Sequence, residues 1–410
     1  MEAGADRSDP SGERPYEGVE KALSRGVALG QRQPQLQAAL YKYTLCVTER
    51  CNLRCSYCYV EKSPRTMSRA TAEAAVDFIF KRAPQGAAVD IGFFGGEPLL
   101  ELPLLEYLTR LVQEHPSYDP ARVGLGLTSN GTLFDDGIGA FLLANRIRLC
   151  ISCDGRPAVH DRCRRSPTGE GSGRRVEQTL RCAQAALPNL RVNAVFGPET
   201  LEDLPDTVAY LSSLGVREIY LNPDVTGAWA PGHAARLEHV YGKVADQYLV
   251  WHRAGDPHYV SLVDVKMGVL ARGGYHPLER CQMGGAELAI APDGSVFPCE
   301  RLFATQDPGR HRMGSVGSGV GSSAELCARR TRPPVNGECA TCGLAPFCMN
   351  WCGCSNYLMT SDYDRVGPFM CASERALCAV ALRVFESGVR EFGPGFLQRA
   401  LGGHGCDERS

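Results

Sequence analysis

The distribution of cysteine constrains this chain more than any other feature of its sequence. Nineteen of its 410 residues are cysteine. Ten of them lie between positions 281 and 378, and three more lie within residues 51–58. The opening residues lack the apolar core of a signal peptide, so we expect a cytoplasmic protein, in which disulfide frameworks are rare. Clustered cysteines in such a protein indicate metal or redox centres.

Composition and charge exclude several classes of protein. The chain has 44 Lys and Arg against 46 Asp and Glu, so we expect no binding of nucleic acid through bulk positive charge. A hydrophobic content of 44% is ample for a packed core and argues against general disorder. No stretch approaches the roughly 18 consecutive apolar residues that span a bilayer, so we expect no membrane partner.

Short apolar runs alternate with amphipathic segments beyond residue 40. Strands are predicted at 43–47, 89–94, 123–128, 147–152, 190–196 and 216–221, and helices at 68–82, 102–114, 135–145, 174–187, 204–214 and 234–251. This alternation predicts an α/β fold with a parallel sheet, either a partial (β/α)6 barrel or an open doubly wound sheet. In both cases the functional residues belong at the carboxyl ends of the strands.

The same patterns predict a division of the chain into segments. A flexible arm is expected first, then the α/β domain, a linker, a small Cys-rich domain, and a C-terminal helix with a tail. Their predicted ranges are 1–40, 41–255, 256–280, 281–380 and 381–410. Within the Cys-rich domain, residues 288–297 predict a hairpin whose turn is Asp293-Gly294.

The first cysteine group follows the first predicted strand and reads C-N-L-R-C-S-Y-C at positions 51–58. Three thiolates at these spacings can occupy three corners of an iron–sulfur cube and leave one iron without a protein ligand. A zinc site would need a fourth ligand at short spacing, and the nearest histidine is His115. This motif resembles the radical S-adenosylmethionine (SAM) superfamily. The resemblance implies that Cys51, Cys55 and Cys58 bind a [4Fe–4S] cluster whose open iron chelates SAM, and that SAM is cleaved to a 5′-deoxyadenosyl radical.

The ends of the next predicted strands extend the resemblance. Residues 95–98, Gly-Gly-Glu-Pro, look like the family element that meets the SAM ammonium, although a strand-ending turn is the alternative. Arg164 matches an arginine that pairs with the methionine carboxylate in some relatives, and a surface salt bridge is the alternative. The SAM-binding residues that the resemblance implies are Tyr57, Gly95, Gly96, Glu97, Ser129, Asn130, Ser152 and Arg164.

The downstream cysteines resemble the SPASM domain, the auxiliary-cluster extension of radical SAM enzymes that mature peptides and proteins. The resemblance implies two further [4Fe–4S] clusters, three in all. Cys281, Cys299 and Cys352 would hold the first auxiliary cluster, and Cys339, Cys342, Cys348 and Cys371 the second. Several relatives supply a fourth ligand to the first, but residues 282–294 contain no cysteine. Either Cys354 or Cys327 would fill that place, or one iron would be open to a substrate thiolate. Zinc at Cys339-x2-Cys342 is the structural alternative.

Glu300 is the candidate catalytic residue. It follows Cys299 directly, where the resembling sulfatase maturases carry an aspartate that acts as a base, and an exposed structural carboxylate is the alternative. We predict an oxidoreductase that abstracts hydrogen from a residue of a ribosomally made peptide and forms a thioether or carbon–carbon cross-link. The alternatives are an anaerobic sulfatase maturase that forms formylglycine from Cys or Ser, and a non-catalytic iron–sulfur electron carrier or zinc-binding module.

Three partners follow from this prediction. The first is a precursor peptide or protein substrate. The second is an external electron donor, a flavodoxin or ferredoxin. The third is a separate leader-binding protein, because the 40 polar residues of the arm are too few to build the winged-helix domain that grips the leader in many relatives.

Overall fold

The computed structural model describes residues 40–187, 190–276, 279–303, 308–321, 335–393 and 395–396. The predicted N-terminal arm lies outside the described residues except for Leu40, and so do Cys327 and most of the predicted C-terminal tail. None of the helices in the described ranges is long and apolar enough to cross a membrane.

The described strands form one sheet in the order β11-β10-β9-β8-β1-β2-β3-β4-β5-β6-β7. Strands β1 to β7 follow chain order and pair in parallel, and the sheet does not close on itself. The first seven are β1 (Leu40–Thr48), β2 (Ala88–Gly95), β3 (Val123–Ser129), β4 (Ile147–Ser152), β5 (Arg191–Phe196), β6 (Glu218–Pro223) and β7 (Tyr259–Val260). The predicted partial barrel is therefore confirmed.

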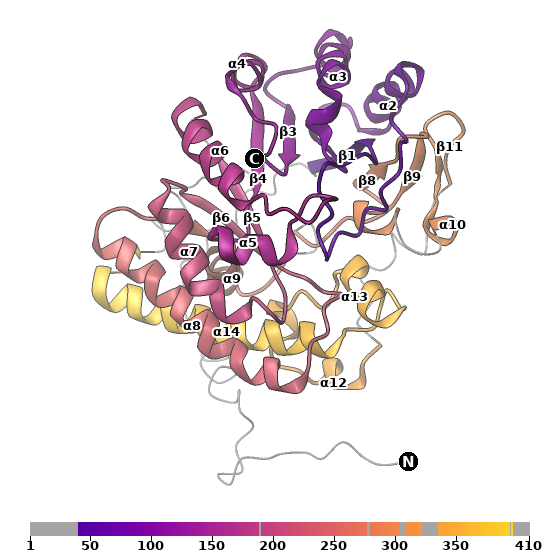
Figure 1. Ribbon diagram of the computed structural model, residues 1–410. Helices are drawn as coiled ribbons and strands as arrows, with labels where there is room; N and C mark the ends of the chain where they lie inside the picture. Colours follow the sequence, from indigo (N-terminus) through magenta and orange to yellow (C-terminus); the bar gives the residue numbers. More distant parts are fainter. Residues whose placement is uncertain are drawn as a thin grey trace.

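Helices connect these strands and cover the sheet (Figure 1). They are α2 (Arg69–Arg82), α3 (Leu102–Glu114), α4 (Asp136–Ala144), α5 (Pro157–Cys163), α6 (Gly173–Ala186), α7 (Leu204–Ser213), α8 (Pro231–Arg253) and α9 (Ser261–Ala271). The C-terminal helix α14 (Pro368–Phe392) packs against α8 and α9, far from α2 and α3 in Figure 1.

Apolar periodicity explains why these elements form and pack. In β2, the buried residues Val89, Ile91 and Phe93 alternate with partly exposed ones, as expected for a strand. In α3, Leu105 and Leu108 are buried one turn apart, as expected for an amphipathic helix. Both sets belong to the same large core between the sheet and its helices.

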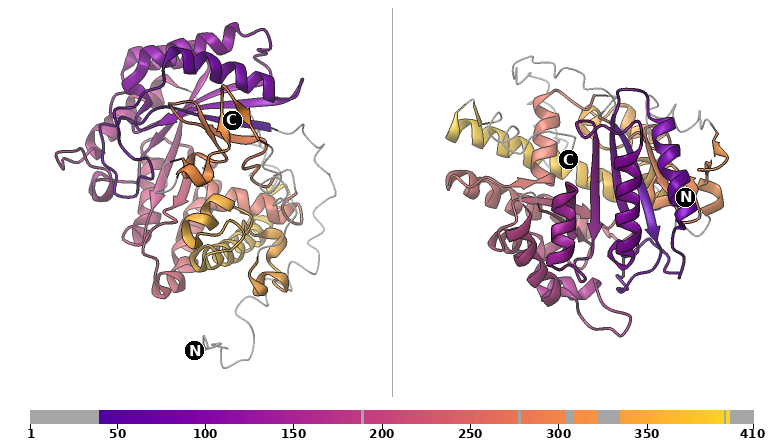
Figure 2. Two further views of the ribbon diagram at one scale, coloured as in Figure 1. Left: turned by 90° about the vertical axis from the view of Figure 1, so that its right-hand side faces the viewer. Right: turned by 90° about the horizontal axis from the view of Figure 1, so that it is seen from above.

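The Cys-rich region continues the main sheet. Strand β8 (Glu287–Ile290) pairs in parallel with β1 and forms an antiparallel hairpin with β9 (Ser295–Phe297), as the Asp-Gly turn predicts. The short strands β10 (Gly314–Ser315) and β11 (Gly319–Val320) extend the hairpin outward. In Figure 2 these orange strands lie beside the indigo strand β1.

The structure differs from the predicted linker at 256–280. This segment contains β7 and the helix α9, whose Leu262, Val263 and Met267 are buried in the main core. Its helical turns are short and almost wholly apolar, so they show little contrast between a buried and an exposed face. Likewise, α14 begins at Pro368 and crosses the predicted boundary at 380 without a break.

Candidate active site and auxiliary cysteine sets

The first cysteine loop follows β1 and gathers its three predicted thiols. Burial raises the pKa of Cys51, and the charges of Glu97 and Cys58 raise it further. Burial also raises the pKa of Cys55 to about 11, while Arg164 lowers it and the other two thiols raise it. Lys62 Nζ lies 3.0 Å from Cys58 Sγ.

This donor set fits an iron–sulfur cluster. The thiols influence one another electrostatically and have cations beside them, as thiolate ligands require. Within the described ranges, no three Cys, His, Asp or Glu side chains are grouped around the position of a single metal ion.

Gly95 and Gly96 let the end of β2 lie directly against the segment that leads into this loop. Gly95 has φ +140°, and a Cβ there would lie 2.2 Å from Thr48 O. A Cβ on Gly96 would lie 2.0 Å from Arg50 O. Gly96 N donates to Thr48 O at 2.7 Å, so the close approach is also hydrogen-bonded. These two glycines thus position the cysteine loop through their lack of side chains.

Glu97 ties the end of β2 to the end of β3. Its carboxylate is 0% exposed and accepts hydrogen bonds from Leu99 N at 3.0 Å, Ser129 Oγ at 2.9 Å and Asn130 N at 2.7 Å. Burial raises the pKa of Glu97, and these three hydrogen bonds lower it in part. Protein donors thus hold this carboxylate in place and give Glu97 a positioning role, while its contact with the SAM ammonium stays a prediction.

Asn130 connects β3 to the cysteine loop. Its Nδ2 lies 3.9 Å from Cys51 Sγ and donates to Asn52 Oδ1 at 2.8 Å. Its Oδ1 accepts from Thr132 Oγ1 at 2.7 Å, and Asn52 Nδ2 donates to the same hydroxyl at 2.7 Å. Sequence reasoning missed Asn52 and Thr132, although both are polar neighbours of predicted site residues.

We expect Glu97→Gln to destabilise the protein. The glutamine amide would place a donor where backbone and hydroxyl donors converge, which leaves a buried hydrogen-bonding group unpaired and costs about 1–3 kcal/mol of unfolding free energy. Urea unfolding of the cluster-free protein measures the change. Glu114→Gln, on the exposed end of α3, is the control and should leave the midpoint unchanged. Equal stability of the Glu97→Gln protein and the unmodified protein would contradict the positioning role.

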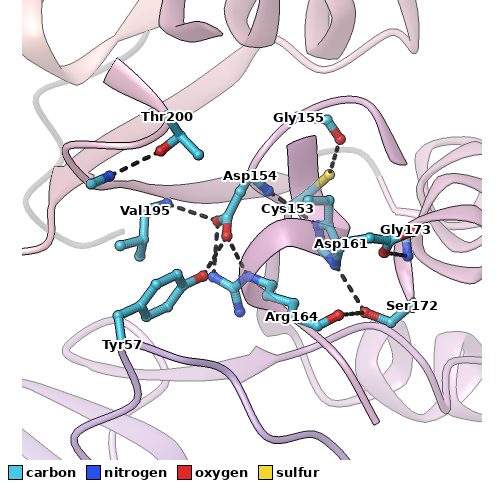
Figure 3. A network of polar contacts seen from close by, with 12 residues as sticks. Tyr57, Cys153, Asp154, Gly155, Asp161, Arg164, Ser172, Gly173, Val195 and Thr200 are labelled. Atoms are coloured by element: carbon cyan, nitrogen blue, oxygen red, sulfur yellow. Dashed lines mark hydrogen bonds and ion pairs between the residues drawn. The ribbon is translucent and has the colours of Figure 1, made fainter. Parts of the chain in front are cut away.

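A second buried network centres on Asp154, just beyond β4 (Figure 3). Arg164 donates to both Asp154 oxygens, at 2.9 Å through Nε and 3.1 Å through a terminal nitrogen, and Val195 N donates at 2.9 Å. The Tyr57 hydroxyl also donates to Asp154. The side chains of Arg164 and Asp154 are only 7% and 2% exposed. Ser152, the last residue of β4, is buried close by in the chain.

This network contains two residues that the resemblance assigns to SAM binding. The structure joins Tyr57 and Arg164 to each other through Asp154, and the Arg164 guanidinium lies 5.2 Å from the centre of the Tyr57 ring. Their contact with SAM stays a prediction. Burial lowers the pKa of Arg164, but the charges of Asp154, Tyr57 and Cys55 and the hydrogen bond to Asp154 together raise it above its usual value, so the guanidinium stays charged. The arginine forms a buried ion pair that fixes the loop carrying Tyr57.

His160 is fully buried and is hydrogen-bonded to this network. Its Nδ1 accepts from Asp154 N at 3.3 Å, and its Nε2 lies 3.0 Å from Ser172 Oγ, which donates to Arg164 O at 2.8 Å. Because Nδ1 accepts, the ring proton belongs on Nε2. Burial lowers the pKa of His160 to about 4.

We expect His160 to make stability depend on pH. Its pKa falls from 6.5 to about 4 on folding, so below pH 6.5 the unfolded chain binds a proton that the folded protein does not. The contribution of His160 to the unfolding free energy is fully present above pH 6.5 and decreases toward pH 4 by about 1.4 kcal/mol per pH unit. His160→Gln, which keeps an acceptor and a donor, should flatten this slope in urea unfolding between pH 7.5 and 5. Substitution of the exposed His239 should preserve the slope; an equal slope in both variants would contradict this assignment.

The first auxiliary set comes together with one additional cysteine. The thiols of Cys281, Cys299, Cys352 and Cys354 pack in one cluster of side chains. Cys352 Sγ lies 3.8 Å from Cys354 Sγ, and a hydrogen bond joins the thiols of Cys299 and Cys354. The structure therefore brings Cys354 to the three predicted ligands, whereas Cys327 lies outside the described residues.

The second auxiliary set lines one pocket. All four of its predicted members lie there: Cys339, Cys342, Cys348 and Cys371. The pocket lies where α12 (Gly337–Ala340) and the following loop face the first turn of α14. This grouping agrees with the predicted ligand set.

A buried ion pair holds the loop that carries Cys348. Lys266 Nζ donates to Glu374 Oε2 and to Phe347 O, each at 2.7 Å, and Met349 N donates to the same carboxylate oxygen at 2.7 Å. The two charged side chains are only 3% and 5% exposed. Burial lowers the pKa of Lys266, but Glu374, through its charge and its hydrogen bond, together with Tyr275 and Cys378 raises it above its usual value, so the ammonium stays charged. Sequence reasoning missed the pair because one member lies in the predicted linker.

Glu300 lies between the first cysteine loop and the first auxiliary set. Its Oε2 is 3.5 Å from Cys299 Sγ, and the residue is partly exposed. Burial raises the pKa of the neighbouring Tyr59, and the charges of Glu300, Cys299 and Cys58 raise it further. Tyr59 is therefore close to thiols of both groups and to Glu300.

Comparison with known proteins identifies one domain of this chain. Residues 45–211 match the Radical SAM superfamily. The uncharacterized protein MJ0907 of Methanocaldococcus jannaschii is 29% identical over 42% of this chain and 59% of its own length. The serine-type anaerobic sulfatase-maturating enzyme of Klebsiella aerogenes is 22% identical over 77% of this chain and 80% of its own length.

Two solved structures share the fold. The structure of anSMEcpe with bound AdoMet and Cp18Cys peptide has a TM-score of 0.72 at 19% identity, and the match covers 85% of this chain and 98% of that one. Streptococcus suis SuiB bound to the precursor peptide SuiA has a TM-score of 0.56 at 13% identity, with 90% and 84% covered. Residues 45–211 thus carry a radical SAM domain, and the described chain, including its Cys-rich C-terminal region, shares the fold of these two structures.

Proposed function

We propose that this enzyme uses SAM to abstract a hydrogen atom from a residue of a peptide or protein substrate and then oxidises that residue. The observation that carries the proposal is the placement of three cysteine groups on one fold, with Tyr59 linking the first loop to the first auxiliary set. A [4Fe–4S] cluster with SAM, when bound at Cys51, Cys55 and Cys58, supplies the radical chemistry.

The residues of this chain have distinct tasks in the proposal. Gly95, Gly96 and Glu97 hold the first cysteine loop against the ends of β2 and β3. Asn130 approaches the thiol of Cys51 and orders the turn beyond β3. The two auxiliary sets would hold two further [4Fe–4S] clusters, which makes three clusters in all. The two auxiliary clusters would receive the electron from the substrate.

Glu300 is the proposed base. A substrate residue that loses a hydrogen atom and an electron must also release a proton, and a partly exposed carboxylate between the two cysteine groups can accept it. The electron leaves through the auxiliary clusters to an external flavodoxin or ferredoxin, which also supplies the first electron. A separate leader-binding protein would deliver a precursor peptide.

Two substrate classes have equal support. The first is a ribosomally made peptide that receives a thioether or carbon–carbon cross-link, and the shared fold of SuiB with its precursor peptide favours it. The second is a sulfatase whose active-site Cys or Ser becomes formylglycine, and the likeness to anSMEcpe and to the Klebsiella enzyme favours it.

A two-stage experiment tests the proposal. Anaerobically reconstituted enzyme with dithionite and SAM should release 5′-deoxyadenosine; no release would refute radical SAM chemistry. Peptides are then added and analysed by mass spectrometry with a hydrazide probe for aldehydes. A sulfatase-type peptide that gains an aldehyde identifies a maturase, whereas a precursor peptide that loses two hydrogens without hydrazide labelling identifies a cross-linking enzyme. Modification of neither peptide would contradict both assignments.

A further inference from the structure

We infer that Cys354 is the fourth protein ligand of the first auxiliary cluster, so that no iron of this cluster is open to a substrate thiolate. The inference rests on the proposed function, since it assumes an auxiliary cluster at Cys281, Cys299 and Cys352. It decides what that cluster can do, because a fully ligated cluster can accept an electron but cannot hold a substrate sulfur.

The positions of the thiols support this assignment. Cys354 Sγ lies 3.8 Å from Cys352 Sγ and is hydrogen-bonded to the thiol of Cys299. Cys281 packs in the same cluster of side chains as Cys299, Cys352 and Cys354. The Cys354 side chain belongs to a buried residue that is 5% exposed and points into this group, not toward solvent.

The local backbone favours thiolates at both positions of the Cys-Gly-Cys segment. Cys352 is the N-cap of the helix α13 (Gly353–Thr360), and Cys354 is in its first turn. Amide groups without helical partners and the positive end of the helix dipole lie there, and they stabilise thiolate over thiol. Cys352 Sγ also lies 3.2 Å from the hydroxyl of Ser355, in the same turn.

A partly buried cation lies beside the four thiols. The side chain of Arg301 reaches the hydroxyl of Ser355 at 3.4 Å, in the same turn as Cys354. Its guanidinium is close enough to Cys354, Cys352 and Cys299 to interact with their charges. A nearby guanidinium offsets part of the negative charge of a set of thiolates and so favours thiolate over thiol.

The other described cysteines are held elsewhere. Cys378 packs with Val269, Leu344 and Phe347, on the side of the second auxiliary set. The stretch 282–294, where several relatives carry a ligand, here forms a turn and β8. Ligand binding at Cys354 would release the thiol proton as the iron–sulfur bond forms, as at any cysteine ligand.

The test uses the full chain in which Cys51, Cys55 and Cys58 are replaced by alanine, so that only auxiliary clusters give signals. The protein is reconstituted without SAM or peptide, and its iron and sulfide are measured. Its electron paramagnetic resonance spectrum is recorded after reduction with dithionite, with and without 2-mercaptoethanol. We expect no response to this thiol. Introducing Cys354→Ala into this triple-alanine parent should have one of two effects. Either the protein loses about one iron per chain, or one iron becomes open and the cluster spectrum then responds to 2-mercaptoethanol.

Two further variants separate ligation from packing. Cys354→Ser should keep the cluster with an altered spectrum, because an alkoxide replaces a thiolate on iron. Cys46→Ala, which removes a fully buried thiol from β1, is the matched control and should leave iron and spectrum unchanged. Cys354→Ala and Cys354→Ser could both lose the whole cluster. In that case, a spectrum of the triple-alanine parent that does not respond to 2-mercaptoethanol supports a closed site.

The inference is overturned if Cys354→Ala has the iron content and spectrum of its parent, or if the parent spectrum responds to 2-mercaptoethanol. Neither measurement involves SAM cleavage or peptide products. A failure of the proposed function is therefore seen in the peptide assay, and a failure of this assignment in the cluster spectra.

Discussion

Replacing Cys51, Cys55 and Cys58 together by alanine is expected to abolish all cleavage of SAM and to remove about a third of the iron. The physical reason is that these three thiols lie on one loop after β1, and the auxiliary sets lie on other segments and share none of them. Release of 5′-deoxyadenosine under dithionite measures the first effect, and iron and sulfide analysis the second.

Cys163→Ala is the matched control for this experiment. Cys163 ends α5, and its carbonyl accepts a hydrogen bond from Ser56 N at 2.9 Å, so its thiol is beside the loop without belonging to the set. The control should keep full iron and full SAM cleavage. Cleavage that survives in the triple variant would show that the first loop does not hold the reactive cluster.

Cys299→Ala is expected to stop product formation and leave SAM cleavage largely intact. The first loop needs none of the auxiliary ligands, so radical formation persists, but a substrate radical without an electron acceptor cannot be oxidised and takes back a hydrogen. Deoxyadenosine release and peptide mass spectrometry on the same samples separate the two steps. Product at normal yield would show that the first auxiliary set is only a structural support.

The Cys299→Ala variant also requires a test of folding, because loss of a cluster can unfold the region around it. Iron retained at the second auxiliary set would show that the fold survives, since the ion pair of Lys266 with Glu374 holds that loop independently. Cys378→Ala removes a buried thiol that lies outside the first set, and it should form product at the normal rate.

The sequence was sufficient for elements whose signals are local. The segments 147–152 and 102–114 were predicted with the bounds that β4 and α3 have. In both, apolar residues recur with one clear period and polar or helix-breaking residues flank them. The segment 261–271 was missed because an almost wholly apolar helix has no such contrast.

The sequence predicted which residues make up the site better than it predicted how these residues contact one another. Spacing indicated the first loop, and the resemblance to the SPASM domain implied the second auxiliary set; the structure gathers both groups. The sequence could not show that Ser129 and Asn130 hold Glu97, or that Asp154 is the ion-pair partner of Arg164, because these partners meet only through the order of strands in the sheet. The SAM contacts that the resemblance assigns to Glu97 and Arg164 stay predictions.

The pairing of β1 with β8 has a mechanical consequence for the enzyme. One strand leads into the first cysteine loop and the other into the hairpin before Cys299, and four residue pairs from Lys42 with Glu287 to Leu45 with Ile290 fix their register. A slip by one residue would shift the auxiliary set by about 3.3 Å and turn each β8 side chain to the opposite face. The backbone of the sheet thus sets the separation between the first cysteine loop and Cys299. In the proposed function, this would also set the length of the path by which the electron leaves the substrate.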